Sequence, residues 1–382
     1  MSEIFTPEKI YQAYLDCRER KKNTINALRF EMERERNLIE LLRELKSRRY
    51  EISRHICFII KEPSPREIFA ADFRDRVVHH LLYNEIYWLF EMDFIENSFA
   101  NRIGKGTHKG VGKLKEYLKE IGKGSYYLKL DIKSFFCSIN KDILFKIVYK
   151  KVKECGMRDY WKEEILWLCK KIIYHDPAKN YIFKGNPENK KLIPKEKSLF
   201  FSQGSGLPIG NLTSQFFTNV YLDRLDQFIY SLGYKYYVRY VDDFVILGDK
   251  SIISAIEKIK EFLKNNLDLK ISDKKIKFQK INKGIDFLGY FIKPDYILIR
   301  QRVVKRLKDK LYQLGQVSDS KLQISHSKIL AMINSYYGHF KHAFSFNLRE
   351  NIYENHLSDL KKNFSAKFDF MSLSLNENKE NY

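Results

Sequence analysis

The spacing of apolar positions along the chain predicts a succession of helices and strands. From residue 24 to residue 45, apolar side chains return about every 3.6 positions among arginine and glutamate, the pattern of a helix with one buried face. Helices are predicted over residues 7–48, 73–87, 141–173, 213–230 and 251–266. Short apolar runs typical of strands cover residues 126–132, 236–239, 244–247 and 284–292.

Polar and glycine-rich stretches separate these elements. Residues 101–112 hold four glycines among basic residues and predict a flexible basic loop, whereas residues 175–203 predict a long exposed loop or hairpin. After Pro294 the chain is predicted to turn helical, and the last dozen residues are polar and expected to be disordered. The order of strands and helices predicts an α+β fold, with an antiparallel sheet covered on one face.

The charge adds a first functional clue. Lys and Arg number 69 against 48 Asp and Glu, which gives a formal charge of +21 spread along the chain. A folded protein this basic repels itself unless an anionic partner compensates, and phosphate backbones are the commonest such partner. A lysine bias shared by all proteins of the source would produce the same excess, so charge alone favours a nucleic-acid partner without requiring one.

Cysteine usage and hydropathy bear on the cellular compartment. The five cysteines include no CxxC pair, which predicts reduced thiols of a cytoplasmic protein and not a disulfide framework or zinc site. The first five residues lack the basic-then-apolar order of a signal peptide. No apolar run of about 18 residues occurs, so we expect no membrane span.

Two acidic sites interrupt otherwise apolar strands. Asp131 follows the run Leu128–Leu130, and the adjacent pair Asp242 and Asp243 lies at a predicted hairpin turn. Carboxylates are costly to bury unless they bind something, and neighbouring carboxylates repel one another unless a cation neutralises them. Mg²⁺ with oxygen ligands is the natural neutraliser. An ordinary surface hairpin with an Asp-Asp turn would also fit the pair taken alone.

The motifs around these carboxylates resemble those of reverse transcriptases. Tyr240–Asp243 is similar to the family's signature hairpin, and Leu130–Phe136 to its first metal-binding strand. Between them, in the family's order, lies Gly206–Gln215, and Gly284–Tyr290 looks like the primer-grip strand. The resemblance extends over residues 20–345 and implies a right-hand polymerase with fingers, palm and a helical thumb.

The resemblance implies a set of metal ligands. Asp131 and Asp242 would hold two Mg²⁺ ions, with Mn²⁺ as an alternative, Asp243 as a supporting ligand and the Ile132 carbonyl completing one coordination shell. Phe136 stands where the family has an aromatic steric gate against the ribose 2′-hydroxyl, although plain core packing would also explain this ring.

The resemblance also implies residues that bind the nucleotide. Arg66 aligns with the fingers arginine that grips the triphosphate, with Lys61 assisting. Ile209, Gly210 and Gln215 belong to the nucleotide-binding motif. Lys275 matches the lysine thought to protonate the leaving pyrophosphate, with Lys274 and Lys277 as rivals for that position.

The implied organisation divides the chain into seven segments. They are an N-terminal helical extension (1–50), fingers (51–125), a first part of the palm (126–140), a fingers insertion (141–202), a second part of the palm (203–293), a thumb (294–350) and a C-terminal tail (351–382).

The wording of the motifs is most like that of diversity-generating retroelement reverse transcriptases. In those enzymes a branched aliphatic residue at the Ile209 position contributes to low fidelity opposite template adenine. The implied function is error-prone cDNA synthesis, with a template RNA (a structured non-coding RNA), dNTPs and a DNA product as partners, and an accessory protein or homo-oligomer as a further expectation. Antiphage defence-associated reverse transcriptases, which copy a dedicated RNA, are the runner-up. A catalytically dead polymerase fold that only binds nucleic acid is the third reading.

Overall fold

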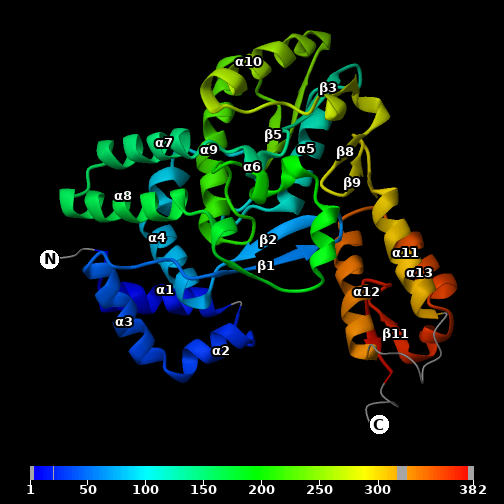
Figure 1. Cartoon of the computed structure of the whole chain (residues 1–382). Coiled ribbons are helices and arrows are strands. Elements are labelled where there is room, and N and C mark those ends of the chain that lie inside the picture. Colours follow the sequence, from blue (N-terminus) through cyan, green and yellow to red (C-terminus); the bar gives the residue numbers. More distant parts are fainter. Residues whose placement is uncertain (1–3, 20, 316–324, 377–382) are drawn as a thin grey trace. The chain divides into compact units, whose positions relative to one another are not determined.

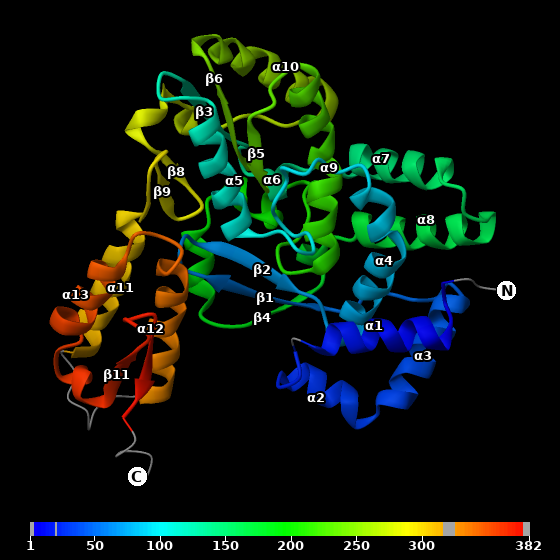
Figure 2. The ribbon, with the colours of Figure 1, turned by 180° about the vertical axis from the view of Figure 1, so that it is seen from behind.

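The computed structural model describes residues 4–19, 21–315 and 325–376, and Figures 1 and 2 trace the chain from opposite sides. Contacts group the chain into two units. The first comprises Met1–Gly106, Lys129–Val245 and Ile253–Lys277, and the second Thr107–Leu128, Ile246–Ile252 and Phe278–Tyr382. Every candidate site residue predicted from the sequence lies in the first unit.

Helices open the first unit, as the apolar spacing predicted. They are α1 (Pro7–Glu19), α2 (Ile25–Met32), α3 (Arg34–Lys46) and α4 (Phe73–Glu91). Both α1 and α2 pack against α4, and three aromatic rings join them. The ring centroid of Phe30 lies 5.2 Å from that of Phe73 and 6.2 Å from that of Tyr14. Asp72 caps α4 by accepting a hydrogen bond from the backbone N–H of Arg74.

A three-stranded sheet follows, in the order β2-β1-β4. Its strands are β1 (His55–Ile60), β2 (Arg66–Ala70) and β4 (Tyr181–Phe183). The first two form an antiparallel hairpin, and β4 pairs with β1 in parallel.

The prediction of a long exposed loop or hairpin over residues 175–203 is therefore wrong in part, because this segment contributes β4 and packs onto the sheet. Cys57, Phe69 and Leu199 form a buried cluster beneath it. Four short 3-10 helices carry the rest of the segment, at Pro177–Lys179, Pro187–Leu192, Lys195–Lys197 and Leu199–Phe201.

A buried carboxylate joins the segment to β2. Glu67 is 6% exposed and accepts hydrogen bonds from the Ser198 hydroxyl at 2.5 Å and from the backbone N–H of Leu199 at 3.0 Å. Burial raises the pKa of Glu67 above its ordinary value.

A further group of helices and a four-stranded sheet complete the architecture around the acidic residues predicted as metal ligands. The helices are α6 (Phe135–Ser138), α7 (Lys141–Glu154), α8 (Asp159–Tyr174), α9 (Leu212–Ser231) and α10 (Ala255–Leu267). The sheet has the order β5-β6-β3-β7, with β5 (Tyr237–Tyr240), β6 (Asp243–Gly248), β3 (Tyr126–Asp131) and β7 (Lys277–Lys280). Phe228 of α9 stacks on Phe262 of α10 at a centroid distance of 4.1 Å. Both predicted strands around the Val241–Asp242 turn are confirmed.

The second unit contains a small sheet and a group of helices. Its elements are α5 (Thr107–Glu120), β8 (Ile285–Phe287), β9 (Tyr290–Ile292), β10 (Ile297–Ile299), α11 (Gln301–Gly315), α12 (His326–Phe340), α13 (Phe346–His356), β11 (Phe364–Lys367) and β12 (Ser372–Leu375). The order β10-β9-β8 is antiparallel throughout.

Three sequence predictions fail in this unit. The loop predicted over 101–112 ends at Thr107, where α5 begins. The single strand predicted over 284–292 is a hairpin, because Leu288 and Gly289 have positive φ of 52° and 88° and reverse the chain. Residues 372–375 of the tail pair with β11 and are ordered, while residues 377–382 lie outside the described residues.

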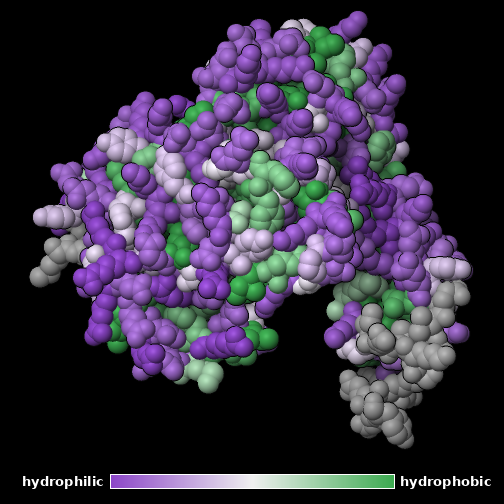
Figure 3. Space-filling model, viewed as in Figure 1, coloured by the Kyte–Doolittle hydropathy of each residue, from purple (hydrophilic) through white to green (hydrophobic). Residues whose placement is uncertain are grey.

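The described surface is largely hydrophilic. Hydrophilic residues cover most of the face seen in Figure 3. None of the helices in the described ranges has the length and apolar character needed to cross a membrane. All five cysteines carry free thiols.

Candidate active site at the tip of the β5–β6 hairpin

Three carboxylates converge where β3 ends and the β5–β6 hairpin turns. Asp131 is the last residue of β3, Asp242 lies in the two-residue turn and Asp243 begins β6. The backbone joins the two sites, since the N–H of Ile132 donates to the carbonyl of Asp242 at 3.3 Å. The backbone thus brings together the chain segments that carry the three predicted residues.

Two lysines contact the outer two carboxylates. Lys275 Nζ lies 2.6 Å from Asp131 Oδ1, and Lys129 Nζ lies 2.9 Å from Asp243 Oδ2. Lys275 reaches Asp131 because residues 270–272 run beside the end of β3. The N–H of Lys133 donates to the Lys270 carbonyl, and the N–H of Ser272 donates to the Asp131 carbonyl. Among the three candidate lysines, Lys275 is the one bonded to Asp131.

Lys129 is a site residue that the sequence reasoning missed. It precedes Asp131 by two positions on β3, so both side chains project from the same face of the strand. That spacing of two was the available signal.

Asp242, between the two lysine-bonded carboxylates, is the electrostatically strained member of the group. Burial raises its pKa from 3.8 to about 6, and repulsion by Asp131 and Asp243 adds to the rise while Lys275 opposes it. A site that holds three partly buried carboxylates favours a bound cation.

The donor set fits Mg²⁺, which prefers carboxylate oxygens, but the lysines hold two of the donors. In the part of the chain that the structure describes, no group of three or more His, Cys, Asp or Glu side chains is arranged to hold a metal ion. Asp131 is paired with Lys275, and Asp243 with Lys129. A cation would therefore bind by displacing an ammonium group, and not by entering a preformed coordination site.

A second group of candidate residues is brought together by the segment from Gly206 to Gly210. The N–H of Leu207 donates to the Phe136 carbonyl at 2.8 Å, and the N–H of Phe69 donates to the Ile209 carbonyl at 2.9 Å. The segment thus connects Phe136 with β2, the strand that begins at Arg66. Ile209 and Phe136 are both partly buried.

Both glycines of this segment have positive φ and close neighbours. A Cβ added to Gly206 would lie 2.8 Å from Cys137 Cα, and one added to Gly210 would lie 3.1 Å from the Phe69 carbonyl oxygen. Glycine is therefore required for the backbone to pass this close to α6 and β2.

The remaining predicted residues lie at two places. Lys61 and Arg66 flank the loop of the β1–β2 hairpin, where Ile60 pairs with Arg66, and both are exposed. Gln215 is exposed on the first turn of α9. With Gly210 it lines a cavity of about 610 Å³ that residues of α1 and α4 also line.

Comparison with known proteins identifies the family. A family described as "Reverse transcriptase (RNA-dependent DNA polymerase)" matches residues 59–292, more than half of the chain. The chain belongs to the reverse transcriptase family. Membership confirms the predicted α+β right-hand polymerase fold, and enzymes of this family generally use divalent metal ions, typically Mg²⁺.

Individual relatives of this reverse transcriptase are distant. It is 23% identical over 262 residues to Protein YkfC of Escherichia coli (strain K12), covering 59% of this chain and 62% of that protein. It is 21% identical over 286 residues to the putative COX1/OXI3 intron 2 protein of Saccharomyces cerevisiae, covering 60% of this chain and 30% of that protein. The chain therefore spans less than two thirds of the length of either relative.

Solved structures include similar folds at low identity. The structure titled telomerase from Candida albicans in complex with a fragment of telomeric RNA shares 13% identity with this reverse transcriptase. The match has a TM-score of 0.47 and covers 79% of this chain and 58% of that one.

The raised pKa of Asp242 predicts a pH-dependent stability. Because the folded-state pKa lies above the ordinary value, the contribution of this group is present at low pH and is lost as the pH rises through about 6. In metal-free buffer, Asp242→Asn should therefore raise the free energy of unfolding by roughly 1–2 kcal/mol at pH 7.5 and by less at pH 5. Urea titrations at both pH values measure this. Asp309→Asn, an exposed carboxyl on α11, is the control, and an equal effect of both variants would contradict the prediction.

The close approach of Gly206 to Cys137 predicts that two glycines of similar φ differ in the stability lost on substitution by alanine. Gly206→Ala should cost about 3 kcal/mol of stability, because both the left-handed backbone and the contact with Cys137 are violated. Gly204 has φ of +89° and nothing within 4 Å of an added Cβ, so Gly204→Ala should cost only about 1 kcal/mol. Thermal unfolding of the two variants tests this, and equal losses would show that the packing against α6 is unimportant.

Proposed function

We propose that this chain is an RNA-directed DNA polymerase whose reaction centre is formed by Asp131, Asp242 and Asp243. The observation that carries the proposal is the convergence of these carboxylates, with the pKa of Asp242 raised to about 6, in a member of the reverse transcriptase family. Its substrates are an RNA template, a DNA primer end and dNTPs.

Two Mg²⁺ ions would be held by Asp131 and Asp242, with Asp243 and the Ile132 carbonyl completing the oxygen donors and Mn²⁺ as an alternative metal. When bound, such ions lower the pKa of the primer 3′-hydroxyl and neutralise charge on the triphosphate. Lys129 keeps Asp243 paired with a positive charge, which limits the repulsion within the group.

The chain's own side chains would bind and orient the nucleotide. Arg66 presents a planar fork suited to phosphate oxygens, and Lys61 adds a second positive charge at the same hairpin tip. Lys275, released from Asp131 when a metal binds there, would carry a proton to the leaving pyrophosphate. Phe136 would exclude a ribose 2′-hydroxyl by its bulk, and Ile209 with Gly210 and Gln215 would line the pocket of the new base pair.

The domain organisation is part of the proposal. Fingers (51–125 and 141–202), palm (126–140 and 203–293) and thumb (294–350) would follow an N-terminal extension (1–50), with residues 351–382 as a tail. The β1–β2 hairpin with Arg66 would then belong to the fingers, as would most of the 175–203 segment that packs onto it.

Loss of the central carboxylates should abolish DNA synthesis. Asp242→Ala and Asp243→Ala, singly and together, should each lower incorporation of labelled dNTP on a primed RNA template by at least about 10²–10³-fold, because charge developing in the reaction loses its compensation. Asp309→Ala is the matched control and should retain activity. Residual incorporation near the wild-type rate in the double variant would refute the assignment. A wild-type protein that binds the primed template and incorporates no dNTP would favour a polymerase fold that only binds nucleic acid.

We further propose that synthesis is error-prone, as in diversity-generating retroelements. The support is Ile209, whose aliphatic side chain cannot hydrogen-bond to the nucleotide or template strand as glutamine would. Ile209→Gln should therefore reduce misincorporation opposite template adenine by about five-fold, the effect of one hydrogen bond of about 1 kcal/mol. Sequencing of cDNA products measures this. Ile209→Leu, which keeps an aliphatic side chain, should leave the error spectrum unchanged, and an equal spectrum in all three proteins would remove the idea.

The RNA bound to the purified protein distinguishes the two biological roles. A template-repeat transcript would support a retroelement, whereas a dedicated structured RNA copied into DNA would support antiphage defence. Purification of the complex followed by sequencing of its RNA provides this observation.

A further inference from the structure

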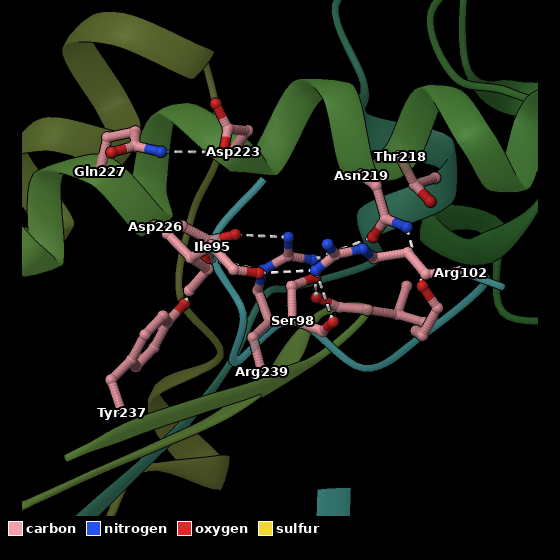
Figure 4. Close-up of polar contacts among 12 residues, drawn as sticks. Ile95, Ser98, Arg102, Thr218, Asn219, Asp223, Asp226, Gln227, Tyr237 and Arg239 are labelled. Atoms are coloured by element: carbon pink, nitrogen blue, oxygen red, sulfur yellow. Dashed lines mark hydrogen bonds and ion pairs between the residues drawn. The ribbon is translucent and has the colours of Figure 1, made fainter. Parts of the chain in front are cut away.

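A buried arginine lies directly beneath the catalytic turn. Arg239 is in the middle of β5 and is fully buried. Its guanidinium donates to both carboxylate oxygens of Asp226 on α9, at 2.7 and 2.6 Å. Its Nη1 also donates to Asn219 Oδ1 at 3.3 Å and to the Val241 carbonyl in the turn at 3.1 Å. Figure 4 shows Arg239 between Asp226 and Asn219.

The surroundings fix the position of this guanidinium. Asp226 accepts a further hydrogen bond from the Tyr237 hydroxyl at 2.7 Å. The backbone of Arg239 is held as well, since its N–H donates to the Asn97 carbonyl and its own carbonyl accepts from the N–H of Phe99, both at 3.0 Å. A planar guanidinium with a bidentate carboxylate has little freedom to move. The donor that faces the turn is therefore held rigidly.

The turn itself needs such support. Val241 has φ of 55°, a left-handed conformation that is unfavourable for a β-branched residue. Its carbonyl accepts from Arg239, and the next carbonyl, of Asp242, accepts from the N–H of Ile132 at 3.3 Å. Two consecutive anchored carbonyls fix the peptide planes on either side of the Asp242 Cα, and so fix the direction of the Cα–Cβ bond from which its carboxylate extends.

We propose that Arg239 is a positioning residue for Asp242, holding the strained Val241 turn in the conformation that aims the carboxylate at the metal position. The inference rests on the proposed function of Asp242. Arg239 touches neither substrate nor metal in this role. It acts through the Val241 carbonyl, and Asp226 acts through Arg239.

A core ion pair with no functional role is the competing explanation. Substitution of Arg239 by lysine distinguishes the two explanations. Lysine keeps the charge that Asp226 requires, so Arg239→Lys avoids the severe loss of leaving a buried carboxylate unpaired. A single ammonium cannot reproduce the planar fork that grips Asp226 and reaches the turn together. The variant thus preserves the ion pair and loses the contact with Val241.

The test compares Arg239→Lys with wild type in two measurements. On a primed RNA template, kcat should fall about 10–100-fold, the scale of a small misplacement of a reacting group, while the KM for dNTP changes by less than about two-fold. The MgCl₂ concentration for half-maximal activity should rise several-fold. Without substrate, the upward shift of the melting temperature caused by MgCl₂ should be smaller than in wild type.

Two further variants test whether Arg239 acts through the Val241 turn. Asparagine accepts the left-handed region more readily than valine, so Arg239→Lys should cost less in kcat and in the MgCl₂-induced shift in a Val241→Asn background. Arg74→Lys is the matched control, because Arg74 also donates to a carboxylate, that of Glu44, and to a carbonyl, that of Glu51. Arg74→Lys should lower stability without changing the dependence on MgCl₂.

Unchanged kcat and unchanged MgCl₂ dependence in Arg239→Lys, or strictly additive effects with Val241→Asn, would overturn the inference and leave an ion pair of the core. The failure of the proposed function looks different, because wild type itself would then incorporate no dNTP. The substrate-free melting experiment still decides the role of Arg239 in that case.

Discussion

Repulsion among three carboxylates is the constraint on which the site depends. Asp131, Asp242 and Asp243 are held together by a strand end and a two-residue turn, in surroundings dry enough to raise the pKa of the middle one to about 6. Such an arrangement is unstable by itself and persists because the fold compensates for it. Lys129 and Lys275 supply positive charge from two sides, and backbone contacts prevent the turn from relaxing away.

The compensation by lysine has a consequence for how metals enter. Each ammonium group interacts with a carboxylate that a metal would need, so binding of a cation and release of a lysine are linked. Lys275 is more exposed, at 56%, than Lys129, at 16%. In the proposed function, the more exposed Lys275 would therefore be displaced first, while Lys129 would stay paired with Asp243.

Sequence reasoning found the residues whose type conflicts with their surroundings. Asp131 and the pair at Asp242 stand out because carboxylates interrupt apolar strands, and the resemblance to a known family then ordered the motifs around them. Lys129 and Arg239 were missed because a basic residue in a basic protein carries no such contrast, although Arg239 also lies in a buried strand. Recognising it required knowledge of Asp226, which is close in space but belongs to another element. The 175–203 segment was misjudged for a similar reason, since its polar composition is local while its pairing with β1 is not.

The same segment contacts both the β1–β2 hairpin and the segment from Gly206 to Gly210. Glu67 directly follows the candidate triphosphate arginine and is bonded to Ser198 and Leu199, about 130 positions later in the chain. Leu199 also fills the space beside Gly206. The lysine-rich segment 175–203 is therefore in contact with both the strand that carries Arg66 and the segment that carries Ile209. In the proposed function these are two walls of the nucleotide pocket, so a change in the length or packing of residues 175–203 would alter both walls at once.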